Sequence, residues 1–373
     1  MKHIFVLLAA LFAAVLLSGC IGRDDPVPPP DSHIPVRVSS RVQSILDQMT
    51  PEEKVGQLFF VRVPEENAAS DVAEYHLGGY IFFGRDVMDR TPEQVRETVV
   101  AYQSQAELPL LIGVDEEGGT VARLSRNPAI RPEPFLSPQE LIALGGMDAV
   151  LSETEEKDAL LHALGFNVNL APVADVSTDP EDFIYARTFG QNAEKTADYI
   201  AEVIGQMNHD RMGSVLKHFP GYGNNVDTHT GIAVDRRPLS RFEEADFLPF
   251  LAGFEVGAPA VMVSHNIMTA VDNKLPASLS PAVHQLLRKE LDFRGVVMTD
   301  DLAMDAVAEY AGDSTAAVLA IQAGNDLLIS DNYQEDIPGV LRALKDGVLS
   351  EGQINNACSR VLNWKEALGL LDD

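Results

Sequence analysis

The feature that most constrains the fold of this chain is an alternation of short apolar runs with longer helical segments between residues 41 and 330. Segments of helical character, such as residues 91–107, 192–210 and 280–292, separate the runs and begin in ways that suit helix N-termini. Strands that alternate with helices predict a parallel sheet, and eight strands are the number that closes a barrel. The eight runs of strand character are residues 55–63, 78–83, 109–114, 166–173, 214–219, 259–264, 294–299 and 325–330.

We therefore predict an α/β fold, a single (β/α)8 TIM-type barrel over residues 41–373 with its active site at the C-terminal ends of parallel strands. The alternative is an open, doubly wound sheet. The glycine fingerprint typical of that fold does not follow the first run. No internal repeat and no linker interrupts the pattern after residue 41, so one domain is expected.

The N-terminal 40 residues have a different character. Residues 1–20 combine a basic start, an apolar run and small residues before a cysteine, which is typical of an export signal. The sequence from Leu17 to Cys20 resembles a bacterial lipobox, which implies that Cys20 is lipidated and becomes the mature N-terminus. Residues 21–40 are polar and proline-rich and are predicted to form a flexible tether. We expect an exported protein, anchored by lipid on the periplasmic or outer-surface side; plain secretion or an uncleaved anchor is the alternative.

Charge limits the partners of the chain. The formal net charge is −28, which would repel phosphate backbones and anionic lipid surfaces. Nucleic acid is therefore not an expected partner, membrane contact is expected through the lipid anchor only, and no obligate protein partner is indicated.

Polar residues recur where the apolar runs stop. In a barrel these positions meet at one end, where such proteins carry their chemistry. Loops are polar in any case, but consecutive Lys-His and Asp-Asp pairs at strand exits are less expected by chance. The residues at the exits are Asp115, Asp175, Lys217-His218, His265-Asn266, Asp300-Asp301 and Asp331.

The segment 217–231 concentrates proton-handling side chains and glycines. Asp227 and His229 are two positions apart, so in an extended segment their side chains project to the same side. The aspartate would then orient the imidazole and leave His229 able to give and take a proton near neutral pH. An Asp-x-His sequence in a surface turn is the structural alternative.

The same segment carries a resemblance to a known family. Residues 217–221, KHFPG, followed by Asp227-Thr228-His229, resemble the KHFPGHG…DSH signature of glycoside hydrolase family 3 in its β-N-acetylglucosaminidase branch. The likeness covers roughly residues 41–370. Further matching motifs follow in order: LGGYIFFGRDV (77–87), GVDEEGGTVARL (113–124), NLAPVADV (169–176), ARTFG (186–190), VMVSHNIM (261–268), TDDLAM (299–304) and RVLNWKEALGL (360–370).

The resemblance implies roles for individual residues. Asp300 would be the catalytic nucleophile, and Asp227 with His229 would be the acid–base dyad. Asp301 remains an alternative nucleophile, and Asp175 either binds sugar or merely ends a strand. Arg123 and Arg187 would otherwise be surface ion-pair residues. The residues that match sugar-binding positions of the family are Asp115, Arg123, Arg187, Lys217 and His218.

Two positions depart from the family pattern. Tyr222 stands where the second histidine of KHFPGHG is usual, and the segment before Asp227 is about one residue shorter than usual. A tyrosine can still donate a hydrogen bond. Neither change removes a catalytic residue, but both bear on the preference for the group that leaves.

The resemblance implies a retaining exo-β-N-acetylglucosaminidase that needs no metal or organic cofactor. Its substrate would be an oligosaccharide with terminal N-acetylglucosamine, from cell-wall muropeptides or from chitin. The alternatives are a metal-dependent barrel hydrolase, for which chelator sensitivity is the test, and a non-catalytic sugar-binding lipoprotein. A β-glucosidase of the same family is a nearer alternative, but those enzymes usually take their acid from a second domain, for which residues after 330 leave no room.

Overall fold

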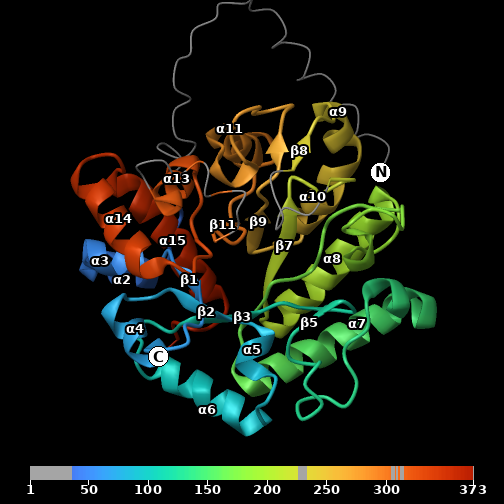
Figure 1. Ribbon diagram of the computed structural model, residues 1–373, viewed down its shortest axis with the longest axis horizontal. Helices are drawn as coiled ribbons and strands as arrows, with labels where there is room; N and C mark the ends of the chain where they lie inside the picture. Colours follow the sequence, from blue (N-terminus) through green and yellow to red (C-terminus); the bar gives the residue numbers. More distant parts are fainter. Residues whose placement is uncertain (1–35, 226–232, 304–306, 308–309, 311–314, 373) are drawn as a thin grey trace, which may run out of the picture.

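The computed structural model describes residues 36–225, 233–303, 307, 310 and 315–372. Its centre is a parallel sheet in the order β1-β2-β3-β6-β7-β9-β11, with helices around the outside (Figure 1). The strands are β1 (Phe60–Arg62), β2 (Gly79–Phe82), β3 (Leu111–Val114), β6 (Val168–Asn169), β7 (Gly213–Phe219), β9 (Ala260–Val263) and β11 (Val296–Thr299).

Residues 326–330 occupy the eighth position of the barrel. The backbone N–H of Thr299 in β11 donates to the carbonyl of Leu327, and that of Phe60 in β1 donates to the carbonyl of Leu328. Parallel bridges join Met298 to Leu327 and Phe59 to Leu328. The predicted TIM-type α/β fold is therefore confirmed. The first predicted run began too early, because Val55 is held in a helix by the preceding Thr50 cap rather than in β1.

The helices begin at the expected polar caps. The side chains of Thr91, Asn192 and Ser280 accept N-terminal backbone hydrogen bonds at the starts of the three helices predicted above. The third of these continues as the π-helical turn η6 (Leu286–Glu290). The α-helices are α2 (Ser40–Gln48), α3 (Pro51–Gly56), α4 (Ala68–Glu74), α5 (Gly84–Val87), α6 (Pro92–Gln103), α7 (Pro138–Leu164), α8 (Ala193–Asp210), α9 (Leu239–Arg241), α10 (Phe247–Glu255), α11 (Pro281–Gln285), α13 (Ala316–Ala323), α14 (Tyr333–Lys345) and α15 (Glu351–Ala367).

Two apolar cores stabilise the barrel, one on each face of the strands. Alternate strand residues, such as Phe60, Leu111 and Met298, fill the interior, while their neighbours pack outward against the helices. Val361 and Trp364 of α15 belong to the interior core, so the C-terminal helix closes one end of the barrel. No helix among the described residues has both the length and the apolar character that crossing a bilayer would require.

A buried lysine in α15 makes stability depend on pH. Lys365 is fully buried, and its Nζ donates to Oε1 of Gln57 at 2.6 Å. Burial lowers the pKa of Lys365 to about 7. The unfolded chain, in which the lysine has its ordinary pKa near 10.5, therefore binds this proton more tightly than the folded chain. The resulting destabilisation is largest below pH 7 and fades as the pH rises toward the unfolded pKa.

As the pH rises from 7 to 9, loss of the proton from Lys365 is expected to raise the free energy of unfolding by about 2 kcal/mol. Urea unfolding of the wild type and of Lys365→Met at pH 7, 8 and 9 measures the effect, because other titrating groups are common to both proteins. The difference in the free energy of unfolding between Lys365→Met and the wild type should shrink with rising pH. The exposed Lys345→Met is the control and should run parallel to the wild type. If the free energy of unfolding of Lys365→Met changed with pH just as that of the wild type does, the lowered pKa of Lys365 would be contradicted.

Candidate active site

A cavity of about 310 Å³ lies at the C-terminal ends of the barrel strands. Ile81, Leu170 and Met262, which also belong to the interior core, contribute to its lining, together with the aromatic rings of Phe83 and Phe183. Most of the remaining lining residues are charged, so the cavity combines an apolar part with a set of ionic groups. The polar side chains at the cavity are Arg62, Asp115, Arg123, Arg187, Lys217, His218, Asp300 and Asp301.

Asp300 and Asp301 follow β11 directly but have different surroundings. Arg62, at the end of β1, forms an ion pair with Asp301 Oδ2, and the backbone N–H of Ala303 donates to Oδ1 at 3.0 Å. Burial outweighs these partners and raises the pKa of Asp301 above its ordinary value. Asp300 accepts the N–H of Asp301 through Oδ1 at 2.8 Å and is only partly buried at the cavity. Asp301 is thus buried beside Arg62, whereas Asp300 is the more exposed carboxylate at the cavity.

Glu117 joins the two central cations of the site. Its Oε1 accepts hydrogen bonds at 2.7 Å from both Arg187 and Lys217, and its Oε2 accepts one from Arg187 at 3.0 Å. Lys217 Nζ also lies 2.5 Å from Oδ1 of Asp115. The Glu117 side chain is only 4 % exposed and that of Lys217 only 2 %. These four groups form a fixed network of alternating charge beneath the cavity.

The network sets the protonation states of its members. Burial alone would raise the pKa of Glu117, but Arg187 and Lys217 hold it well below its ordinary range. Burial alone would lower the pKa of Lys217, but Asp115 and Glu117 raise it above its ordinary value. Glu117 and Lys217 therefore stay charged at neutral pH, and the cavity presents a preorganised set of hydrogen-bond donors and acceptors.

Asp175 serves as an anchor beneath the site. Its Oδ2 accepts from Nδ1 of His218 at 2.7 Å and from the backbone N–H of His218 at 3.1 Å. Its Oδ1 accepts the backbone N–H of Tyr222 at 2.7 Å. Because Asp175 is only 1 % exposed and does not line the cavity, it positions His218 instead of facing a ligand. The pairing fixes the His218 proton on Nδ1, which leaves Nε2 to accept from Arg187 at 3.2 Å.

Arg123 lines the other side of the cavity. Its backbone N–H donates at 2.8 Å to Glu116, a fully buried carboxylate that also accepts from Leu124 and Ser125. The Arg123 Nε atom is buried, and among the described residues it has no hydrogen-bond partner. An arginine held through its backbone, with part of its guanidinium unpaired at a cavity, is suited to bind an oxygen-rich ligand.

Tyr222 and His265 are both buried near the site. The Tyr222 ring packs against His218 with centroids 5.5 Å apart and against Phe183 at 5.8 Å. His265 donates from Nε2 to the carbonyl of Asp301 at 2.9 Å, and Ser278 lies 2.7 Å from its Nδ1. Both residues therefore support neighbouring groups of the site.

Arg237 connects the two ends of the loop that follows β7. Its guanidinium pairs with Asp246 at 2.8 Å and with Asp235 at 2.7 Å. Asn225 in turn donates to Asp235 at 2.7 Å. The network therefore links the chain before residue 226 to the chain after residue 232. Asp227 and His229 lie between these ends and, like Cys20, fall outside the described residues.

The structure brings Asp115, Arg123, Arg187, Lys217, His218 and Asp300 around one cavity, as the barrel geometry requires. Arg123 and Arg187 are cavity residues and not surface ion-pair residues. The sequence reasoning missed Glu117 and Arg62. Glu117 stands two positions after Asp115 in GVDEEGG, so the acidic run after β3 was a signal for it, whereas the partner of Arg62 lies 239 positions away.

Among the described residues, metal ligands do not gather at this cavity. Within residues 36–225, 233–303, 307, 310 and 315–372, no three His, Cys, Asp or Glu side chains at the cavity have their ligand atoms close enough to one another to share a metal ion. The described carboxylates here are paired with arginine or lysine, or accept backbone N–H groups.

Comparison with known proteins gives consistent results. The model of the glycosyl hydrolase family 3 N-terminal domain matches residues 50–364. A protein named beta-hexosaminidase from Alkalilimnicola ehrlichii is 34% identical over 280 residues, which cover 72% of this chain and 78% of that protein. A beta-hexosaminidase from Stenotrophomonas maltophilia is 33% identical over 308 residues, which cover 80% of this chain and 88% of that protein.

A solved structure is also similar. The glycoside hydrolase family 3 beta-N-acetylglucosaminidase from Paenibacillus superposes with a TM-score of 0.80 at 31% identity. The match covers 86% of this chain and 63% of that chain, so this protein spans less than two thirds of that relative.

Proposed function

Since the chain belongs to glycoside hydrolase family 3 and is a glycoside hydrolase, we propose that it is a retaining exo-β-N-acetylglucosaminidase. The observation that carries the proposal is the partly buried carboxylate of Asp300, at a cavity where Glu117 fixes Arg187 and Lys217 and Asp175 fixes His218. The names of the relatives above support the choice of N-acetylglucosamine as the sugar.

In the proposed first step, a carboxylate oxygen of Asp300 attacks the anomeric carbon and forms a covalent glycosyl-enzyme. The bond from that carbon to the glycosidic oxygen breaks, and His229 gives its proton to the departing oxygen. In the second step, water attacks the anomeric carbon, His229 takes its proton, and Asp300 leaves as the carboxylate. Two inversions give net retention. Asp227 orients His229; the roles of this dyad rest on the resemblance of its sequence motif.

The remaining site residues position the sugar. Lys217, Arg187 and Arg123 are the donors, and Asp115 is the acceptor, for sugar hydroxyls and the acetamido group. Because ionic partners already fix Lys217, Arg187 and Asp115, these side chains lose little freedom when the sugar binds. We assign Asp301 to positioning, since both of its carboxylate oxygens already have partners in Arg62 and Ala303.

Turnover of 4-nitrophenyl β-N-acetylglucosaminide against the matching β-glucoside, with the form lacking residues 1–20, tests the proposal. We expect preference for the N-acetyl substrate, no loss with EDTA at 25 °C, and an early product of retained configuration by NMR. A preference for the glucoside would favour the β-glucosidase alternative. Loss of turnover with EDTA would favour a metal-dependent hydrolase, and binding of N-acetylglucosamine without turnover would favour a sugar-binding protein.

For the natural substrate, we propose terminal N-acetylglucosamine of cell-wall muropeptide fragments, with chitin oligosaccharides as the competing substrate class. The choice rests on the proposed export, because an exported enzyme meets wall material. Comparing kcat/KM for a purified muropeptide disaccharide and for chitobiose distinguishes the two classes.

We also propose that the protein is exported and lipid-anchored through Cys20. The basic start, apolar run and small residues before this cysteine support the proposal. Mass spectrometry of protein recovered from membranes should show a chain that begins at lipidated Cys20. A chain that begins elsewhere and is recovered without lipid would refute it.

A further inference from the structure

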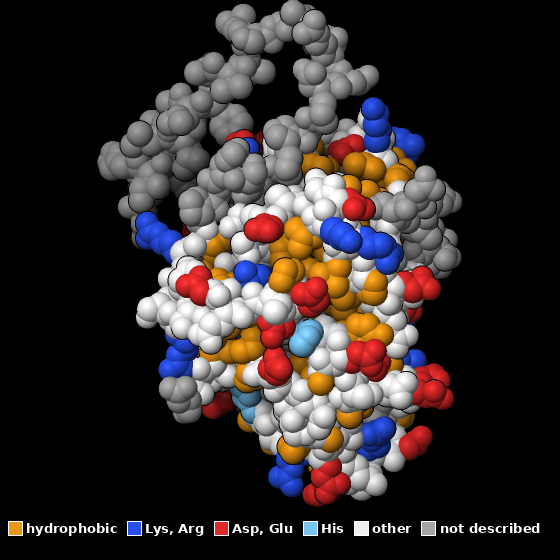
Figure 2. All heavy atoms as spheres, turned by 90° about the vertical axis from the view of Figure 1, so that its left-hand side faces the viewer, with side chains coloured by type: hydrophobic (Ala, Val, Ile, Leu, Met, Phe, Trp, Pro, Cys, Tyr) orange, Lys and Arg blue, Asp and Glu red, His pale blue; other side chains and the backbone are white. Residues whose placement is uncertain are grey.

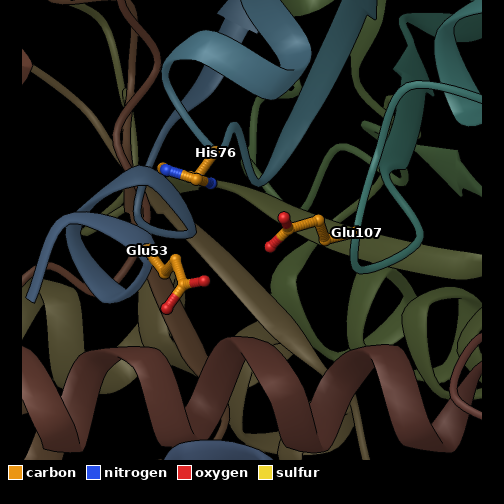
Figure 3. A group of neighbouring side chains, drawn as sticks. All are labelled: Glu53, His76 and Glu107. Carbon is orange, nitrogen blue, oxygen red and sulfur yellow. The ribbon is translucent and has the colours of Figure 1, made fainter. Parts of the chain in front are cut away.

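A second group of candidate ligands lies far from the catalytic cavity. Figure 3 shows Glu53, His76 and Glu107 from three separate segments, with their side chains directed toward a common space. One oxygen or nitrogen atom from each lies within 4.8 Å of those of the other two. We propose that these three residues form a binding site for a divalent transition metal, with zinc as the expected ion.

The fold places the three residues at the opposite end of the barrel from Asp300. Glu53 in α3 precedes β1, His76 precedes β2, and Glu107 precedes β3. All three therefore lie near the N-terminal ends of the strands, whereas the catalytic cavity is at the C-terminal ends. A metal here would cross-link three segments, so its expected effect is on stability and not on the chemical step.

Glu53 is held in place by the start of α3. Its Oε2 accepts hydrogen bonds from the backbone N–H and the hydroxyl of Thr50, at 2.5 and 2.9 Å. These bonds fix the side chain and leave Oε1 for another partner.

His76 is held by its backbone. It has a left-handed conformation with φ 53°, which is uncommon for residues other than glycine. Its carbonyl accepts from Gln57 Nε2 at 2.9 Å, and a Cβ added to Gly56 would lie 2.5 Å from that carbonyl oxygen. The close approach to Gly56 fixes the turn and thereby the direction of the imidazole.

The charges of the cluster favour a cation. Two of the three side chains, Glu53 and Glu107, are carboxylates, and one oxygen of each lies within 4.8 Å of the other. Within the part of the chain that the structure describes, neither carboxylate has a lysine or arginine ion-pair partner. A bound divalent ion would pair with both carboxylates. Figure 2, which faces the side of the molecule with α3 and α4, shows acidic side chains around a histidine among apolar ones.

The chemistry of the ligands favours zinc. One imidazole and two carboxylates suit zinc, which binds three protein ligands with water at an open fourth position. Calcium and magnesium prefer oxygen ligands only. A cavity of about 270 Å³ adjoins the cluster, and its lining includes Ile45, Met49 and Leu77 as well as the three ligands. The open coordination position therefore has room for water.

The test is zinc titration of protein stripped with EDTA, followed by calorimetry and by thermal unfolding. We expect one zinc ion bound per chain at this site and a Tm that rises with zinc concentration. Glu107→Gln, at an exposed residue, and His76→Asn, which tolerates the left-handed backbone, should each weaken binding at least 10-fold. The exposed Glu97→Gln and His209→Gln are matched controls and should bind as the wild type does.

Equal zinc affinity in the wild type and in Glu107→Gln and His76→Asn would overturn the proposal, as would the absence of zinc binding. Hydrolysis measured in parallel at 25 °C separates the two sites. Zinc bound at Glu53, His76 and Glu107 leaves initial rates unchanged, whereas zinc binding that only inhibits turnover and survives both substitutions belongs to the catalytic cavity and refutes the site.

Discussion

Replacing Asp300 with alanine is expected to lower kcat/KM for 4-nitrophenyl β-N-acetylglucosaminide by at least about 10⁴-fold, since the variant lacks the carboxylate that we propose forms the covalent intermediate. Asp300 is the more exposed of the two aspartates after β11 and lies at the cavity. The fold should be retained, because the side chain lies at the edge of a cavity and not in either apolar core. Initial rates and far-UV circular dichroism of the purified variant measure both expectations.

Asp301→Asn is the matched control for this prediction. Asp301 forms an ion pair with Arg62. Loss of the Asp301 charge should therefore shift neighbouring side chains of the site and reduce kcat/KM by roughly 10–100-fold. A slow fluorinated N-acetylglucosamine substrate should leave a sugar adduct on wild-type protein, which tandem mass spectrometry can place on either aspartate. An adduct on Asp301, or an active Asp300→Ala, would reverse the assignment and make Asp301 the nucleophile.

The second large effect is expected at Glu117. Glu117→Gln keeps the size of the side chain but removes the charge that neutralises Arg187 and Lys217. Leaving buried charges without compensation costs about 3–5 kcal/mol, so the free energy of unfolding should fall by roughly that amount. Both cations should also shift, and we expect kcat/KM to fall at least about 100-fold, mostly through KM. Urea unfolding and steady-state kinetics measure the two effects.

The pH dependence of this effect follows from the pKa of Glu117. Because Arg187 and Lys217 hold that pKa well below its ordinary value of 4.5, the stabilisation is fully present above the unfolded pKa and is lost only as the pH falls through the folded pKa. The decrease in the free energy of unfolding caused by Glu117→Gln should therefore be constant from pH 5 to pH 8. Glu155→Gln, at an exposed position of α7, is the control and should have little effect. An unchanged KM would restrict Glu117 to a structural role.

Much of the fold could be predicted because the decisive signals are local. Each apolar run was short and bounded, and the helices between them began at capping residues such as Thr91 and Asn192. The boundary errors are also local: the first run was read from residue 55, although the Thr50 cap keeps Val55 in α3.

The candidate site was only partly predictable. The positions of Asp115, Lys217 and Asp300 at strand ends predicted that they lie at the site, because a barrel brings these ends together independently of loop conformation. Their contacts were not predictable. The resemblance indicated Asp300 as the nucleophile, but spacing alone kept Asp301 as an alternative. The ion pair that separates their environments joins Arg62 to a residue 239 positions away.

By itself, the sequence determined the alternation of strands and helices, the number of strands and the kinds of side chain at the strand ends. These depend on hydrophobic periodicity and on capping, which act between residues close in the chain. Only the tertiary structure decided that Glu117 lies buried between two cations, that Asp175 supports His218 from below, and that Glu53, His76 and Glu107 converge. Such contacts join residues distant in the chain, and their burial and electrostatic partners exist only once the barrel has closed.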